Sequence, residues 1–450
     1  MNNHYIEHSR SGCALLGALA TIAAINRVVP VVHSTAGCSI QYQEGIVPFG
    51  GSTPSGAQWG APLSSSNISQ KHVVFGGGSR LREQLKNTVK VVSADLFVVL
   101  TGCATEMVGD DIRAMTKEGR EQGFPVICAN TPGFGGSFHR GYQQAIRALI
   151  EQLPELQVEA TPRNSLVNIW GVVPQQDAFW YGHLQQIEAL LDESGIVANT
   201  LFGGERGLKE WKDIPYAALN VVVSQWGRET AILLEQKYGT PWIEVAGLPI
   251  GPLATDRLIQ AIANYLPLDA DALQSIQQRK QQQFSRTLAT LGPVYYRIGL
   301  QREFAIVGEL SLVSGVVYFL AHSLGLIPKL AIITDVRADE HSEAVTTSLI
   351  GVAGSSDISV EYSEDAGEIR DLLRSSDAEL LIGSSLEREI AEELNVPLLA
   401  IFFPVADSLI LNRGYLGDSG ALALIEDIGG AILRSSRSAV SVDRVAQCAG

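Results

Sequence analysis

The chain has 450 residues, of which 46% are hydrophobic and 18% charged, a composition typical of a globular protein with two or three domains. The formal charge of −15, from 33 Lys and Arg against 48 Asp and Glu, argues against partners such as nucleic acid or an anionic membrane. The longest apolar run, Cys13 to Ile25, is too short to cross a bilayer, and the polar N-terminus does not resemble a signal peptide. Five cysteines favour reduced or metal-bound thiols over a disulfide framework, so we expect a cytoplasmic protein.

Short apolar runs alternate with helical patterns along the whole chain, which predicts an α/β fold of three Rossmann-like domains with parallel sheets. The expected domains are 1–160, 161–300 with a polar connector helix, and 301–450. In the first domain we expect strands over 28–32, 96–100 and 124–128, helices over 14–25, 79–89 and 141–153, and a loop over 50–66. In the second we expect strands over 167–173, 196–202, 219–223 and 241–245, helices over 183–191 and 229–238, and the connector over 271–288. In the third we expect strands over 303–308, 329–334, 358–362, 380–383 and 398–402, and helices over 311–324, 340–349, 366–373, 386–394 and 420–433.

Three cysteines of the first domain stand in turns of small residues at element ends. Cys13 opens an apolar helix, while Cys38 and Cys103 follow buried strands. Parallel strands end at one edge of a sheet, and helix N-termini favour a thiolate, so we expect three thiolates side by side. This arrangement is typical of a metal or cluster site, with zinc as the alternative metal and three buried core residues as the metal-free alternative. Three thiolates leave a cubane cluster one ligand short, so a non-cysteine group or a second polypeptide would complete the site.

Other candidate residues have simpler interpretations. Cys128 lies inside an apolar strand and Cys448 in the C-terminal tail, so both are expected to be structural or incidental. His33 could reach a cluster sulfur, although a core histidine is favoured. The glycines after Phe75 are not followed by Gly-Lys-Ser/Thr, which excludes a Walker A loop. Asp110 and Asp111 are expected to complement the dipole of the next helix.

In order and spacing these motifs resemble nitrogenase component 1, and within it the β-type (K) subunit. Cys13, Cys38 and Cys103 are similar to its P-cluster cysteines. The likeness covers nearly the whole chain, through the further segments 73–77, 130–134, 248–256 and 403–417. The family's α-type subunit holds the active-site cofactor through a cysteine and a C-terminal histidine. This chain has no cysteine between Cys128 and Cys448 and no histidine after His341, so it is not expected to ligate that cofactor.

The resemblance implies an oxidoreductase subunit that relays electrons. Cys13, Cys38 and Cys103 would hold half of a P-cluster, an [8Fe-7S] cluster shared with an α-type (D) partner in an α2β2 heterotetramer. An ATP-hydrolysing iron protein would dock over the subunit pair, with Phe75 matching the family's apolar docking residue. The catalytic iron–sulfur cofactor would lie in the partner, so this chain is expected to contribute no catalytic residue.

The sequence departs from the family's pattern at two places. Gly133 stands where the family's β-subunits carry a serine that binds the oxidised cluster, so that redox-dependent ligand is expected to be absent. The segment before Cys13 is short, which favours a nitrogenase-like reductase. Within this group we favour methylthio-alkane reductases, which cleave C–S bonds. The alternatives are a nitrogenase that reduces dinitrogen, a non-catalytic cofactor-assembly scaffold and a metal-free α/β binding protein. A protochlorophyllide-type reductase is less favoured, because its shared cluster is smaller.

Overall fold

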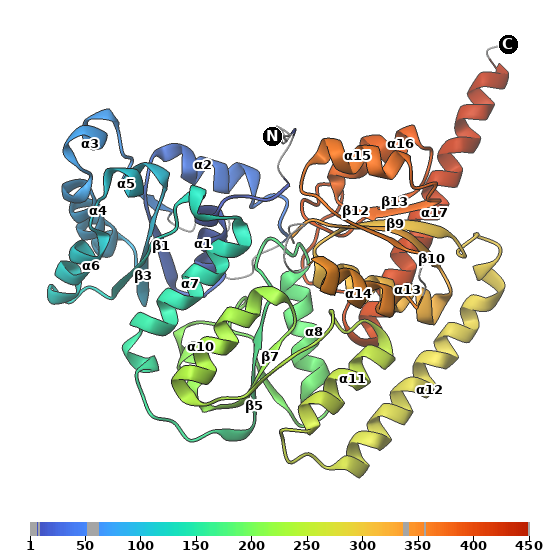
Figure 1. Cartoon of the computed structure of the whole chain (residues 1–450), viewed down its shortest axis with the longest axis horizontal. Helices are drawn as coiled ribbons and strands as arrows, with labels where there is room; N and C mark the ends of the chain where they lie inside the picture. Colours follow the sequence, from blue (N-terminus) through green and yellow to red (C-terminus); the bar gives the residue numbers. More distant parts are fainter. Residues whose placement is uncertain (1–6, 8–9, 52–62, 336–341, 355–356, 449–450) are drawn as a thin grey trace. The chain divides into compact units, whose positions relative to one another are not determined.

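A computed structural model describes residues 7, 10–51, 63–335, 342–354 and 357–448. The chain divides into two compact units (Figure 1). The first contains residues 11–244 and 409–412, and the second contains the described residues of 1–10, 245–408 and 413–450. Three sheets are formed, each with all strands parallel, two in the first unit and one in the second. The predicted α/β class with parallel sheets is therefore confirmed, while the three domain boundaries stay a prediction.

The first sheet has the strand order β2-β1-β3-β4. Its elements are α1 Ala14–Ala23, β1 Val28–His33, α2 Ala36–Gly45, β2 Ser64–Ser65, α3 Gln70–Phe75, α4 Gly78–Val91, β3 Leu96–Thr101, α5 Cys103–Val108, α6 Ile112–Glu121, β4 Val126–Ala129, η1 Gly133–Gly135, α7 Phe138–Gln152 and η2 Pro154–Leu156. Helices α4 and α6 cover one face of the sheet, and α1 and α7 cover the other. The central strands are buried along their whole length, which explains their unbroken apolar runs.

The second sheet of the first unit has the order β6-β5-β7-β8. Its elements are β5 Arg163–Trp170, α8 Trp180–Asp192, β6 Val197–Asn199, α9 Leu208–Lys212, η3 Ile214–Tyr216, β7 Ala217–Val222, η4 Gln225–Gly227, α10 Arg228–Tyr238 and β8 Trp242–Glu244.

The second unit is built on the sheet β11-β10-β9-β12-β13. Its elements are α11 Gly251–Ala263, α12 Ala270–Tyr295, β9 Glu303–Gly308, α13 Leu310–Leu324, β10 Ile327–Ile333, α14 Ser342–Ala353, β11 Ser359–Tyr362, α15 Ala366–Arg374, β12 Leu380–Gly383, η5 Ser385–Glu387, α16 Arg388–Glu393, β13 Leu398–Ala400 and α17 Gly417–Cys448. The connector predicted over 271–288 is the longer helix α12. Within the described ranges, no helix combines the length and apolarity needed to span a membrane.

Several short helices were not expected from the sequence. Helices α2, α3 and α5 lie where turns or unassigned segments were predicted, and α9 and α11 were not predicted at all. Most of these segments are too short to show a helical period, and α2 has almost no amphipathic face. Part of the predicted loop over 50–66 lies outside the described residues, and its described end contains β2.

The backbones of helices α1 and α7 are in direct contact. A Cβ added to Gly17 would lie 1.8 Å from the carbonyl oxygen of Phe138, and one added to Gly141 would lie 1.8 Å from that of Ala14. Glycine is therefore required at both crossing points. This contact fixes the start of α1, where Cys13 lies, against the start of α7 and the loop that precedes it.

Candidate metal centre

The three predicted thiols lie at the start of three helices. Cys13 is the N-cap of α1, Cys38 lies in the first turn of α2, and Cys103 is the first residue of α5. Helices α2 and α5 follow the carboxyl ends of β1 and β3, which pair along their whole length. The expectation that Cys38 closes a turn is wrong, because the helix begins two residues before it.

Two of these thiols, Cys13 and Cys103, lie beside Gly133, in the loop between β4 and α7. A Cβ built on Gly133 would lie 2.9 Å from the Cys103 sulfur and 3.2 Å from the Cys13 sulfur. The same loop pairs with the Cys13 segment, since Cys13 forms an antiparallel bridge with Ser137 and the Ala14 N–H donates to the Gly136 carbonyl at 3.0 Å. Cys38 and Cys103 both lie close enough to Cys13 to affect its ionisation. The structure thus brings the three predicted residues together.

Small residues make this convergence possible. The Ser34 hydroxyl lies 3.2 Å from the Cys38 sulfur. A Cβ on Gly102 would lie 2.0 Å from that same hydroxyl, so only glycine fits immediately before Cys103.

Burial opposes ionisation of one of the thiols. It raises the pKa of Cys13, and the neighbouring Cys103 and Cys38 raise it further, although hydrogen bonds from the backbone of Leu16 and Leu15 work in the other direction. The backbone N–H groups at the helix start thus favour the thiolate, as expected, but burial outweighs them in the pKa of Cys13. A bound cation would reverse this balance, because a coordinated thiol loses its proton.

Two polar residues that the sequence did not single out hold α5 against the Gly133 loop. The Glu106 carboxylate, on α5, accepts hydrogen bonds from the Asn130 amide at 2.6 Å and from the Thr101 hydroxyl. The Thr101 hydroxyl in turn accepts from the Thr131 N–H at 2.9 Å. Glu106 and Asn130 are 24 residues apart, and no local pattern in the sequence connects them.

His33 is the core histidine that the sequence favours, whereas Asp110 has a role other than the expected one. His33 is fully buried, as a core histidine is, and its ring nitrogens contact Ser66 and Asp110 rather than a sulfur. Burial lowers the pKa of His33, although Asp110 acts in the opposite direction. Asp111 caps α6 by accepting from the Ala114 N–H at 3.0 Å, whereas Asp110 accepts from the Gly77 N–H. Only Asp111 therefore has the predicted helix-terminal role.

The donor set fits a shared cluster better than a single ion. Cys13, Cys38, Cys103 and Cys128 are free thiols, and Cys128 is buried in the core on the α4 and α6 face of the sheet. Across the described ranges, no three His, Cys, Asp or Glu side chains are arranged to hold one metal ion. A cluster differs in that its thiolates bind different iron atoms, so they need to face one space without meeting at a point.

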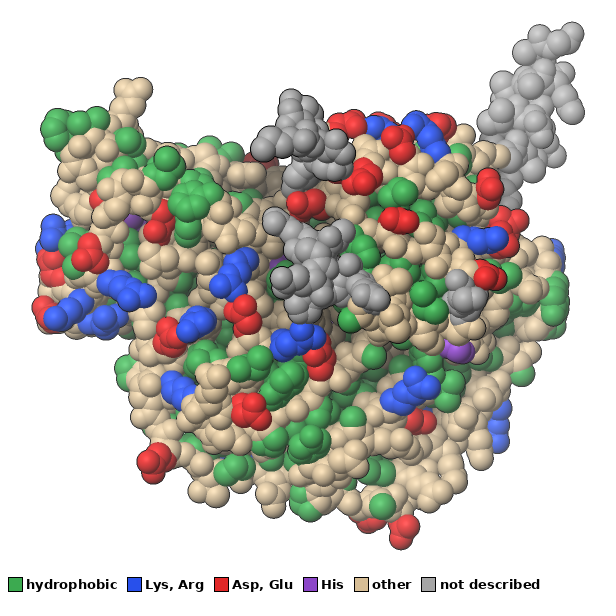
Figure 2. Space-filling view, viewed as in Figure 1, with side chains coloured by type: hydrophobic (Ala, Val, Ile, Leu, Met, Phe, Trp, Pro, Cys, Tyr) green, Lys and Arg blue, Asp and Glu red, His purple; other side chains and the backbone are tan. Residues whose placement is uncertain are grey.

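An exposed apolar surface lies beside this centre. Val73, Val74 and Phe75 at the end of α3 are exposed, Phe75 by 86%, as are Met107 on α5 and Phe134 beside Gly133. Figure 2 shows hydrophobic side chains gathered over α3, at the upper left. A cavity of about 510 Å³ opens beside Phe75 and is lined by polar and charged residues that include Lys71, His72, Arg80 and Glu83. Exposed apolar side chains grouped in this way are typical of a protein interface.

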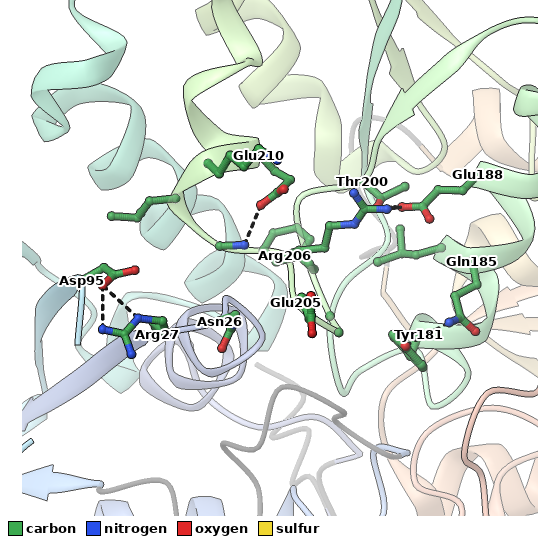
Figure 3. Close-up of a pocket in the computed structure, with 17 residues that line it drawn as sticks. Asn26, Arg27, Asp95, Tyr181, Gln185, Glu188, Thr200, Glu205, Arg206 and Glu210 are labelled. Carbon is green, nitrogen blue, oxygen red and sulfur yellow. Dashed lines mark hydrogen bonds and ion pairs between the residues drawn. The ribbon is translucent and has the colours of Figure 1, made fainter. Parts of the chain in front are cut away.

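A second cavity, of about 550 Å³, lies at the opposite edge of the same sheet (Figure 3). Arg27 and Asp95, which precede β1 and β3, form an ion pair on one side of it, and Arg206 pairs with Glu188 on the other. No cysteine or histidine is among its lining residues. It is therefore separate from the thiol centre.

Comparisons with known proteins agree with the geometry. A family model described as nitrogenase component 1 type oxidoreductase matches residues 13–433. The nitrogenase molybdenum-iron protein beta chain of Methanococcus maripaludis is 26% identical, with 94% of this chain and 93% of that one covered. The chain of the same name from Bradyrhizobium diazoefficiens is 25% identical over 92% of this chain and 82% of that one. A solved structure titled "Nitrogenase Cp1 at pH 6.5" has a TM-score of 0.78 at 21% identity, covering 96% and 94% of the two chains, and it supports the fold alone.

Proposed function

Because this chain belongs to the nitrogenase component 1 family, as a β-type subunit of an oxidoreductase, we propose that it relays electrons within a two-component reductase. Cys13, Cys38 and Cys103 would hold its half of a P-cluster, an [8Fe-7S] cluster completed by thiolates of an α-type partner in an α2β2 complex. The observation that carries the proposal is that Cys13 and Cys103 meet beside Gly133 at one sheet edge, with Cys38 close enough to Cys13 to affect its pKa. When bound, the cluster supplies reversible electron storage between a donor protein and the partner's catalytic cofactor.

The residues around the thiols have the properties that such a site requires. Cys13 is partly buried, and Gly133 and Gly102 leave room where any side chain would meet a sulfur or Ser34. Glu106 and Asn130 tie the loop to α5, which fixes the spacing between Cys103 and Cys13. A rigid ligand set of this kind limits the rearrangement that accompanies each electron transfer.

The exposed apolar surface supports the proposed partners. Phe75, in the Val73–Phe75 segment, is our candidate for contact with an ATP-hydrolysing iron protein, and Met107 and Phe134 are candidates for contact with the α-type subunit. Aromatic and methionine side chains are the residue types enriched in such interfaces. We also propose that the complex is cytoplasmic, because a reducing compartment keeps the three thiols available as ligands.

The substrate would bind in the partner, so no residue of this chain selects it. We keep C–S bond cleavage of methylthio-alkanes as the favoured reaction and reduction of dinitrogen as the alternative. Chain length does not separate the two, because a Methanococcus chain named as a molybdenum-iron protein beta chain is covered to 93%.

The first experiment measures iron and acid-labile sulfide in the chain co-expressed anaerobically with its α-type partner. We expect about eight irons per subunit pair beyond the partner's cofactor, and loss or rearrangement of this iron in Cys103→Ala. Cys128→Ala is the matched control, since it removes a buried thiol from the same sheet but away from Gly133. Iron found only in the partner's cofactor, and unchanged in Cys103→Ala, would refute the proposal.

Turnover separates a reductase from a cofactor-assembly scaffold. With an iron protein and ATP, a reductase reduces methylthio-alkanes or dinitrogen, and a scaffold reduces neither. A colourless protein without iron would instead indicate a metal-free α/β binding protein.

A further inference from the structure

The end of helix α3, which carries Phe75, is attached to a buried carboxylate of another segment. The Gly77 N–H donates to both oxygens of Asp110, at 2.8 and 3.1 Å. Asp110 follows α5 directly, and its side chain is only 8% exposed. No side chain fits at Gly77, because a Cβ there would lie 2.5 Å from an Asp110 oxygen and 3.1 Å from the His33 ring. The main chain after Phe75 therefore rests directly on these two side chains.

His33 connects this carboxylate to the Cys103 turn. Its Nε2 lies 3.1 Å from Asp110, and its Nδ1 lies 3.0 Å from the Ser66 hydroxyl. Its carbonyl oxygen accepts hydrogen bonds from the Gly102 N–H at 3.1 Å and from the Thr105 hydroxyl at 2.7 Å. One buried residue thus contacts the Asp110 carboxylate through its ring and the start of α5 through its main chain.

The remaining contacts of this pair are also satisfied. Asp110 donates its own N–H to the Thr105 carbonyl at 3.2 Å, and the preceding Gly109 ends α5 with a positive φ of 80°. Burial lowers the pKa of His33 and keeps the ring neutral, so Nε2–H donates to Asp110 and Nδ1 accepts from Ser66. Buried polar pairs with all partners present hold their elements in one arrangement.

We propose that Asp110 and His33 form a positioning pair that holds the Phe75 segment in the orientation required to dock a partner protein, at a fixed place relative to Cys103. The proposal rests on the proposed function, since it assigns Asp110 and His33 a role in docking at that same surface. Neither residue touches a thiol or a substrate. Their effect passes through Gly77 to Phe75 on one side and through Gly102 to Cys103 on the other.

The test compares two substitutions of one side chain. Asp110→Ala removes the acceptor for the Gly77 N–H, whereas Asp110→Asn loses the same charge but retains an acceptor oxygen. In the complex with the α-type partner, we expect Asp110→Ala to raise the iron-protein concentration for half-maximal turnover about tenfold, and Asp110→Asn to restore most of it. The maximal rate and the iron content are expected to stay close to wild type in both.

Two readouts do not depend on turnover. Amide hydrogen exchange over 70–78 is expected to accelerate in Asp110→Ala and to return toward wild type in Asp110→Asn. In a double-mutant cycle, Asp110→Ala is expected to add little to the effect of Phe75→Ala on iron-protein affinity, because both changes act through the same contact. Asp111→Ala is the matched control, since it truncates the adjacent carboxylate and removes only the cap of α6.

The outcomes distinguish this inference from the proposed function. If the wild-type complex holds no shared iron and supports no ATP-dependent reduction, the proposed function is wrong. If the wild type is active but Asp110→Ala has the wild-type half-saturating concentration and exchange rate, the positioning role is wrong. Equal impairment of Asp110→Ala and Asp110→Asn would also overturn it, because charge rather than the Gly77 contact would then be responsible.

Discussion

Gly133 lies so close to Cys103 that an added Cβ would stand 2.9 Å from the sulfur. The same Cβ would lie 3.2 Å from the sulfur of Cys13. A side chain at position 133 would therefore reach both sulfurs, and the glycine of this chain has no side chain there.

A hydroxyl introduced at this position is expected to act as an additional ligand. In Gly133→Ser the Oγ would lie beside the sulfurs, and an alkoxide there stabilises oxidised iron. We expect the EPR spectrum of the oxidised complex and its midpoint potential to differ between Gly133→Ser and Gly133→Ala. The alanine variant has the same crowded Cβ without the oxygen, so identical spectra for the two variants would contradict the prediction.

Truncation of Phe75 is expected to weaken docking of the iron protein. Loss of an exposed aromatic side chain from an interface centre costs about 1.4 kcal/mol or more, which corresponds to a tenfold weaker affinity. The measurement is the dissociation constant of the iron protein for the α2β2 complex. Val91→Ala, which truncates an equally exposed side chain at the far end of α4, should leave this constant unchanged.

The sequence predicted the strands and the convergence of the thiols for a clear physical reason. Runs such as Leu96–Thr101 are buried on both faces, and parallel strands end at a common edge. It could not predict the contact of His33 with Asp110, which are 77 residues apart, because each residue has a local explanation of its own. The raised pKa of Cys13 was missed for a related reason, since burial depends on the packing of α7 and not on the helix that Cys13 begins.

Stability of the first unit is expected to depend on pH through His33. Burial lowers the pKa of the folded state below the ordinary value of 6.5, so the folded chain binds this proton less readily than the unfolded chain. The contribution of His33 to the free energy of unfolding is therefore full above pH 6.5 and is lost as the pH falls through the lowered pKa.

This pH dependence can be followed by tryptophan fluorescence, because all six tryptophans lie between residues 59 and 242. We expect His33→Gln to lower stability at pH 8 and to flatten the decline between pH 8 and pH 5. His322→Gln, which replaces an exposed histidine of the second unit, should keep the wild-type slope. A decline that is equally steep in His33→Gln would assign the pH dependence to other groups.

Stability of the second unit is expected to depend on the buried ion pair of Arg10 and Glu387. The guanidinium contacts both Glu387 oxygens, at 2.5 and 2.9 Å, and both side chains are almost fully buried. Arg10→Ala leaves the carboxylate buried without its cation, which costs about 3–5 kcal/mol. Arg370→Ala breaks an exposed pair with Glu7 and should cost much less, because surface ion pairs contribute little to stability. Thermal unfolding followed by circular dichroism compares the two variants, and similar losses would contradict the prediction.

The backbone contact between α1 and α7 bears on how the protein matures. Since Gly17 and Gly141 bring the two helices together, the place of Cys13 beside the Gly133 loop is set by the polypeptide alone. On the proposed function, a newly made chain without iron would therefore already have a formed site, and its ordering entropy would be lost during folding rather than at metal insertion. Zinc fingers behave in the opposite way, because they fold only around their ion. The proposed cluster would thus enter a site that the packing of α1 and α7 has already shaped.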